Sequence, residues 1–263
     1  MTLQLLLALA SGALVSFVLG LVGGGGSLLA LPLLVHVVGV RSPHIAIGVS
    51  AAAVAANALT NLGLHARQRR VKWRCAALFT VSGVAGAAAG SALGKSVNGD
   101  ALLALFGVLM AIVGAWMLRR PARAGREDVQ LTRSSAPTLA PRLMALGFAT
   151  GAASGFFGIG GGFLIAPALM WATDMTLVMA IGSSLVAVSA FGATTAASYA
   201  LSGLVDWRLA GLFMLGGLAG GFMGARLTAK LAPRAHLLRL VFAAFVIVAG
   251  VYVTTQGVRV LTS

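Results

Sequence analysis

The stretch GLVGGGGSLLALP, from Gly20 to Pro32, interrupts a long apolar segment with four consecutive glycines. Residues 3–39 contain no Lys, Arg, Asp or Glu. One straight helix of that length would exceed a ~30 Å hydrocarbon core by half or more, at ~1.5 Å per residue. Each interior glycine also costs a helix ~1 kcal/mol relative to alanine. We therefore expect an apolar helix that breaks at Gly23–Gly26.

The chain carries a second copy of this stretch. GFFGIGGGFLIAP, Gly155 to Pro167, matches it at an offset of 135. The match continues at an offset of 134 through AIGVS and AIGSS (46–50 and 180–184), and through VKWR and VDWR (71–74 and 205–208). A single offset held over ~70 positions predicts an internal duplication. We expect an N-terminal repeat over 1–118, an Arg- and Pro-rich linker over 119–142 and a C-terminal repeat over 143–263.

The composition is that of an integral membrane protein. Of 263 residues, 59% are hydrophobic and only 9% are charged, with a mean hydropathy of +0.98. A soluble domain carries about 25% charged residues because water must wet its surface. The apolar segments are 3–39, 45–64, 75–94, 101–118, 143–173, 176–201, 209–229 and 237–254. We predict an all-α integral membrane protein with about eight transmembrane helices in two homologous four-helix repeats, helices 1 and 5 being broken at the glycine clusters.

Basic residues set the expected orientation and leave a second topology open. The net charge of +14 is concentrated in a loop over 67–74 and in the linker. This is the positive-inside pattern and not a nucleic-acid-binding surface, so both regions are expected in the cytoplasm of a bacterium, with the chain a multi-pass protein of the inner membrane. Eight spans divide the basic residues 13 against six. Ten crossings, in inverted repeats of five, divide them 15 against four, and this alternative stays open.

The polar residues argue against catalysis. All five acidic residues fall in expected loops or at helix ends, so no carboxylate is expected at bilayer depth for acid–base chemistry or a proton relay. Cys75 is the only cysteine, and the four histidines show no metal-ligand spacing. We expect no enzyme activity, no metal and no cofactor.

The glycine breaks are the expected binding site. Free N–H groups beside the start of a half-helix attract anions, and hydroxyl and amide side chains within the spans add uncharged donors. Close helix packing is the alternative role, and it is the expected one for Gly83, Gly86, Gly90, Gly217, Gly220 and Gly224. Lys95 and Arg226 are expected to snorkel, or else to line the anion path. The predicted substrate-binding residues are Gly23, Gly24, Gly25, Gly26, Ser27, Ser50, Asn57, Asn61, Gly158, Gly160, Gly161, Gly162, Ser184, Thr194 and Thr195.

With these glycine breaks, the AIG-x-S element and the V-K/D-W-R motif, the chain resembles the TauE/SafE family of sulfite and organosulfonate exporters. The resemblance covers all but the linker and implies a small bacterial inner-membrane permease for sulfur-containing anions. One departure is that Gly24 and Ser27 correspond to Ile159 and Gly162, so the two halves need not bind ligand equally.

We therefore predict a secondary transporter that moves a small oxyanion, of the sulfite, sulfonate or sulfoacetate type, outward by alternating access between the repeats. Its expected partners are the anion and the bilayer, with a homodimer as a possibility. The alternatives are an anion channel, and an assembly or metal-handling factor that acts through His36 and His44.

Overall fold

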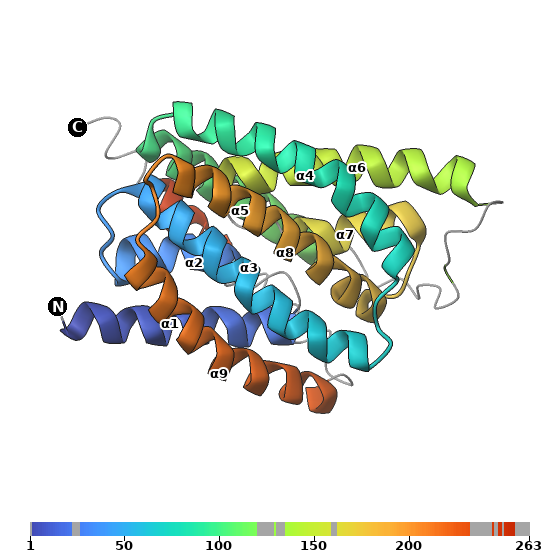
Figure 1. The fold of residues 1–263 in the computed structure, drawn as a ribbon, viewed down its shortest axis with the longest axis horizontal. Helices are drawn as coiled ribbons and strands as arrows, with labels where there is room; N and C mark the ends of the chain where they lie inside the picture. The colour runs from blue at the N-terminus through green and yellow to red at the C-terminus, as the bar shows by residue number, and fades with distance from the viewer. Residues whose placement is uncertain are drawn as a thin grey trace.

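The computed structural model describes residues 2–22, 27–119, 129, 135–158, 162–231, 244, 247–248 and 250–255. Every described element is a helix, which confirms the all-α prediction (Figure 1). In chain order they are α1 (Thr2–Val22), α2 (Ser27–Pro32), the π-helix η2 (Leu33–Val37), α3 (Pro43–Arg67), α4 (Trp73–Ser96), α5 (Gly99–Arg119), α6 (Ala136–Phe157), α7 (Gly162–Thr173), α8 (Leu177–Leu201) and α9 (Trp207–Leu231).

The helices are those of a membrane protein. Among the described residues, three helices are long and apolar enough to cross a bilayer: Pro43–Arg67, Trp73–Ser96 and Val178–Leu201. Large apolar side chains such as Val81, Leu105 and Phe148 are exposed on the outside of the bundle. Such a surface is stable where the surrounding solvent is lipid.

Local sequence explains where several helices begin and end. Ser42 caps α3, its Oγ accepting from the Ile45 N–H at 3.5 Å, and Pro43 takes the first turn, where no N–H is needed. Asp206 caps α9 by accepting from the N–H groups of Arg208 and Leu209. At its C-terminus, α6 is capped by Gly158, whose φ of 66° is a left-handed value that glycine adopts without strain.

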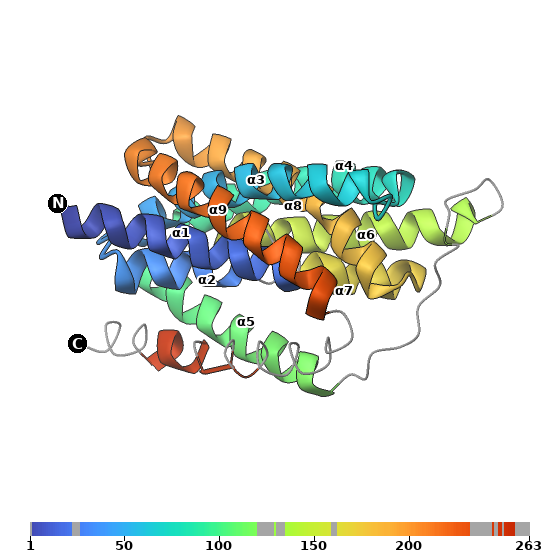
Figure 2. The same ribbon diagram turned by 90° about the horizontal axis from the view of Figure 1, so that it is seen from below.

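The chain reverses direction between α1 and α2 and again between α6 and α7. The helix α1 contacts α2 and also η2, so the second piece runs back beside the first (Figures 1 and 2). Likewise, the start of α6 and the end of α7 line one cavity through Arg142 and Trp171. Each pair is thus two separate helices packed side by side, where the sequence analysis expected one interrupted span. This arrangement is closer to the ten-crossing alternative, although the number of crossings stays a prediction.

The helices α3 and α8 form the centre of the bundle and run antiparallel. Gly48, near the start of α3, packs against the Leu204 carbonyl just beyond the end of α8. At the opposite end, Gly182 of α8 packs against the Arg70 carbonyl just beyond α3. The sequence offset of 134, on which the predicted repeat rests, also relates Gly48 to Gly182 and Arg70 to Leu204. The two contacts are therefore equivalent ones, made once by each half of the chain.

Two parallel helix pairs, α1 with α9 and α4 with α6, flank this centre and are also packed through glycines. Gly220 of α9 abuts the Ala13 carbonyl, and Gly86 of α4 abuts the Phe148 carbonyl, leaving no room for a Cβ. Gly224 and Gly90 make the corresponding contacts one turn later. Close approach through small residues is how membrane helices associate, so the packing role predicted for these glycines is confirmed. Each pair joins one helix from each half of the chain.

Candidate functional site

The two glycine clusters are only partly described. Gly23, Gly24, Gly25, Gly26, Gly160 and Gly161 lie outside the described residues. Ser27 and Gly162, the first residues of α2 and α7, are both buried. Gly158, at the end of α6, is the member of the second cluster whose surroundings can be followed.

Ser50 and Gly158, predicted from separate halves, lie in contact. The Ser50 Oγ is 2.9 Å from its own helix carbonyl at Ile47 and 3.0 Å from the Gly158 carbonyl, so its hydroxyl can donate to either. The Ile47 side chain fills the space where a Cβ on Gly158 would lie. Ile47 and Ser50 of α3 therefore connect the first half of the chain to the end of α6.

Asn57 and Asn61 form the most unusual polar group of the bundle centre. They lie one turn apart on α3, at 1% and 2% exposure. Their amides face Gly217 and Gly221 of α9, and the Asn61 Nδ2 donates to the Asn57 carbonyl at 2.9 Å. Three side-chain atoms, Asn57 Nδ2, Asn57 Oδ1 and Asn61 Oδ1, have no hydrogen-bond partner. A buried polar atom without a partner costs about 1–3 kcal/mol, so this arrangement is poor for stability and suited to a ligand.

The predicted hydroxyls of α8 divide into two kinds. Ser184 donates to the Ile181 carbonyl and Thr194 to the Ala190 carbonyl, each at 2.8 Å, so both are satisfied by their own helix. The Thr195 Oγ1 is buried without a partner. Only Thr195 of these three offers a free hydroxyl.

The sequence analysis missed Ser154 on α6. Its Oγ is fully buried without a partner, and its carbonyl accepts from the N–H of Gly158. The available signal was its place one helical turn before the first glycine of the second cluster.

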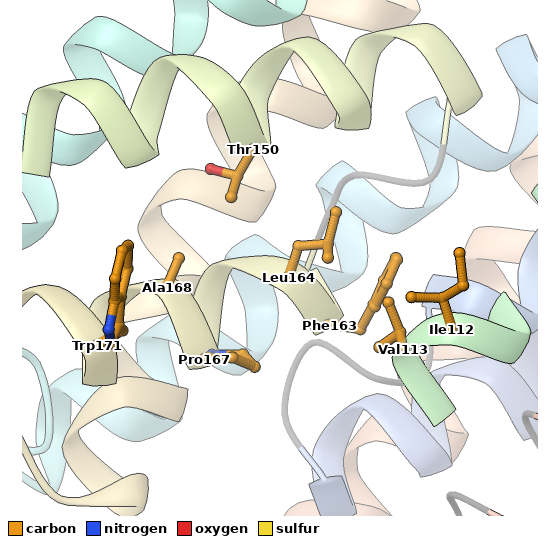
Figure 3. A pocket seen from close by; sticks show the side chains of 8 residues that line it. All are labelled: Ile112, Val113, Thr150, Phe163, Leu164, Pro167, Ala168 and Trp171. Atoms are coloured by element: carbon orange, nitrogen blue, oxygen red, sulfur yellow. The ribbon is translucent and has the colours of Figure 1, made fainter. Parts of the chain in front are cut away.

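Two cavities lined by described residues lie away from these polar groups. One, of about 370 Å³, lies between α5, α6 and α7 (Figure 3). Its residues are Ile112, Val113, Thr150, Phe163, Leu164, Pro167, Ala168 and Trp171. The single hydroxyl among them, on Thr150, already donates to the Leu146 carbonyl. A neighbouring cavity of about 540 Å³ shares Trp171. The first is apolar, the second carries one cation at Arg142, and neither is lined by Asn57 or Asn61.

The two histidines considered for a metal-handling role, His36 and His44, contact different residues. The His36 Nδ1 donates to the Pro32 carbonyl, and its ring meets Tyr252 edge-on. The ring of His44 stacks instead on Tyr199. In the described part of the chain, no three His, Cys, Asp or Glu side chains are grouped so as to hold a metal ion.

Comparison with known proteins gives the family. The family model "Sulfite exporter TauE/SafE" matches residues 8–253. The chain belongs to the TauE/SafE family. It is 50% identical over 254 residues, 96% of each chain, to a "Probable membrane transporter protein" of Xylella fastidiosa. It is 25% identical to the "Probable membrane transporter protein YunE" of Bacillus subtilis, covering 84% of this chain and 87% of that one. No solved structure was found to match it.

Family membership confirms the resemblance seen in the motifs and establishes the coarse function. This TauE/SafE protein is a membrane transporter.

Proposed function

We propose that this TauE/SafE transporter exports a small oxyanion, of the sulfite or sulfonate type, across the bacterial inner membrane, and that the anion binds beside Asn57 and Asn61. The observation that supports the proposal most is the unpartnered state of the two amides at the bundle centre. Proteins seldom bury amides in this way. A ligand oxygen that accepts from the Asn57 Nδ2 would give this donor a partner, whereas the two Oδ1 atoms need a donor, such as a hydroxyl of the ligand.

The charge of the surroundings favours an anion over a cation. The described acidic residues are Asp100, Asp174 and Asp206, and all three are at or beyond helix ends. No carboxylate from the described residues therefore balances a cation at the bundle centre. Uncharged donors without a fixed negative charge suit an oxyanion, because each of its oxygens accepts more than one hydrogen bond.

The arrangement of helices supports alternating access by inverted repeats. The helices α3 and α8 occupy equivalent positions in the two repeats and run antiparallel, as a two-fold axis in the membrane plane would require. Ten crossings also give the larger charge asymmetry, 15 basic residues against four. Rocking α1–α9 against α4–α6 would open the centre to each side in turn.

Export needs no coupled ion in this scheme. An inside-negative potential drives a monoanion outward with ~2.3 kcal/mol per 100 mV. The sequence contains no nucleotide-binding motif, which agrees with a secondary transporter.

The test uses purified protein in liposomes loaded with sulfite, with the membrane potential set by a potassium gradient and valinomycin. We expect efflux that saturates with sulfite concentration and rises when the interior is made negative. Unsaturable conductance would instead assign a channel. A strict requirement for a Na⁺ or H⁺ gradient would contradict uncoupled export.

A further inference from the structure

Three ionisable or polar side chains from three helices meet at one end of the bundle. They are His44 at the start of α3, Lys95 at the end of α4 and Tyr199 near the end of α8, and we call them the Lys95 cluster. The helices α3 and α4 belong to the first half of the chain and α8 to the second. The cluster is distinct from the asparagine pair, because the part of α3 between His44 and Asn57 is about 20 Å long.

Lys95 joins the two halves and keeps an uncompensated charge. Its Nζ donates to the Ser198 carbonyl at 3.2 Å and to the Ser202 Oγ at 3.0 Å, and lies 5.9 Å from the centre of the Tyr199 ring. In the described parts of the chain, Lys95 forms no ion pair with a carboxylate. An ammonium has three N–H groups, so one remains for another acceptor. The sequence analysis expected this lysine to snorkel, with lining of the anion path as the alternative.

The two aromatic members contribute polar atoms that the described structure leaves unused. Tyr199 is fully buried and its hydroxyl has no hydrogen-bond partner. The His44 Nε2 is likewise buried without a partner. The two rings stack with their centroids 6.5 Å apart at an interplanar angle of 25°. A capping role at the end of α8 accounts for the lysine contacts, but it gives no partner to the hydroxyl or the imidazole.

We infer that the Lys95 cluster is a second anion-binding site, at the mouth of the transporter opposite the basic loop over 67–74. Its ligand is a small oxyanion that accepts hydrogen bonds from the Lys95 ammonium and the Tyr199 hydroxyl. Charge-assisted hydrogen bonds of this kind are about twice as strong as neutral ones. That the cluster binds the exported anion just before its release rests on the proposed function. Anion binding by the cluster does not rest on it.

The lysine side of the cluster can be reached from outside the bundle, whereas the fully buried Tyr199 hydroxyl lies deeper, so a ligand that contacts both requires a local side-chain movement. Lys95 and His44 are half-buried, and Ser202 beside them is exposed. By the positive-inside rule this end faces the periplasm, since the basic loop and the linker mark the other face. A cation here attracts the anion outward from the uncharged centre at Asn57 and Asn61.

The experiment measures equilibrium binding of radiolabelled sulfite to the purified full-length protein. The variants are Lys95→Gln, Tyr199→Phe and, as a matched control, Arg41→Gln, which removes an exposed cation from the same end. We expect wild type to show two classes of site. Lys95→Gln should raise the Kd of one class about tenfold or more, and Tyr199→Phe should raise the Kd of the same class by a smaller factor. Arg41→Gln should bind as wild type does.

Further variants separate this inference from the proposed function. Lys95→Arg should retain binding because it keeps the positive charge. Melting temperatures identify variants that fail to fold. Asn57→Leu should remove the other class of site. Loss in Lys95→Gln with full binding in Asn57→Leu would support the outer site and contradict the central one. Unchanged sulfite binding in both Lys95→Gln and Tyr199→Phe, or no saturable binding by wild type, would overturn the inference.

Discussion

Asn57 and Phe191 occupy corresponding places in the two halves but have opposite chemistry. The repeat offset relates Asn57 to Phe191, and it also relates the glycines that they contact, Gly83 and Gly217. Phe191 is fully buried and stacks on Phe79 with ring centroids 6.3 Å apart. Asn57 is equally buried and its amide has no partner.

This difference predicts separate roles for the two halves of the chain. At Phe191 the space beside the glycine is filled by an aromatic ring, which gives dispersion contacts and has no polar atom to satisfy. At Asn57 the corresponding space holds an amide whose donors and acceptors are unused. We therefore expect the Phe191 side to stabilise the protein and the Asn57 side to bind the substrate.

The largest expected effect is on stability, at Phe191. Replacing it with alanine leaves a cavity against Gly83 and Phe79, and truncations of this kind cost about 3–5 kcal/mol. The melting temperature in detergent should therefore fall strongly in Phe191→Ala. In Asn57→Ala it should change much less, because Asn57 makes no side-chain hydrogen bond. An equal fall in melting temperature in the two variants would contradict the separate roles expected of Phe191 and Asn57.

Transport should respond in the opposite way. Asn57→Leu keeps the shape of the side chain and removes its polar atoms, so sulfite efflux from liposomes should fall at least about tenfold, the effect of losing one or two hydrogen bonds to a charged ligand. The same change should leave the melting temperature unchanged or raise it, since it removes both unpartnered atoms of the Asn57 amide. Phe191→Leu is the matched control, and its efflux should stay close to that of wild type.

Gly158→Ala should destabilise the protein by more than the cost of placing alanine in a left-handed conformation. A left-handed residue other than glycine costs about 1–2 kcal/mol, and the Ile47 side chain fills the space of the new Cβ. Gly203, with a φ of 70° and open surroundings, is the control that carries the backbone cost alone. Urea or thermal unfolding of Gly158→Ala and Gly203→Ala compares them. Equal losses would show that the contact with Ile47 contributes nothing.

The smallest expected effect is at Ser50. Ser50→Ala removes the hydrogen bond to Gly158, worth about 1 kcal/mol. The corresponding change in the second repeat, Ser184→Ala, removes only a bond within its own helix and should cost less. The difference between the two melting temperatures measures the contact between the halves. A larger loss in Ser184→Ala would contradict it.

The sequence was sufficient for the features that depend on composition and local spacing. It predicted the all-α membrane class, the packing role of glycines such as Gly86 and Gly220, and the family. It also selected Ser50 and Gly158, which the structure places in contact. These features could be read because lipid exposure, helix breaking and close helix packing follow from residue type and spacing.

The direction of each helix and the contacts between distant side chains could not be predicted from the sequence. Composition and spacing do not state whether the helix that follows a glycine cluster continues in the same direction or runs back, because glycine permits many backbone conformations. The residues next to Asn57 in the sequence do not indicate that its amide faces Gly217 of α9, because that contact joins opposite halves of the chain. The satisfied hydroxyls of Ser184 and Thr194 look identical in sequence to the unsatisfied one of Thr195. Only tertiary packing separates them.

The most direct test of the central claim is the thermal stabilisation of purified protein by sulfite. A ligand that binds the folded state raises its stability by RT ln(1 + [L]/Kd), about 2.7 kcal/mol at 100 times Kd. With Lys95→Gln as the background, so that the outer site does not contribute, we predict a rise in melting temperature that Phe191→Leu retains and Asn57→Leu abolishes. An undiminished rise in Asn57→Leu would show that the asparagines are not the anion site.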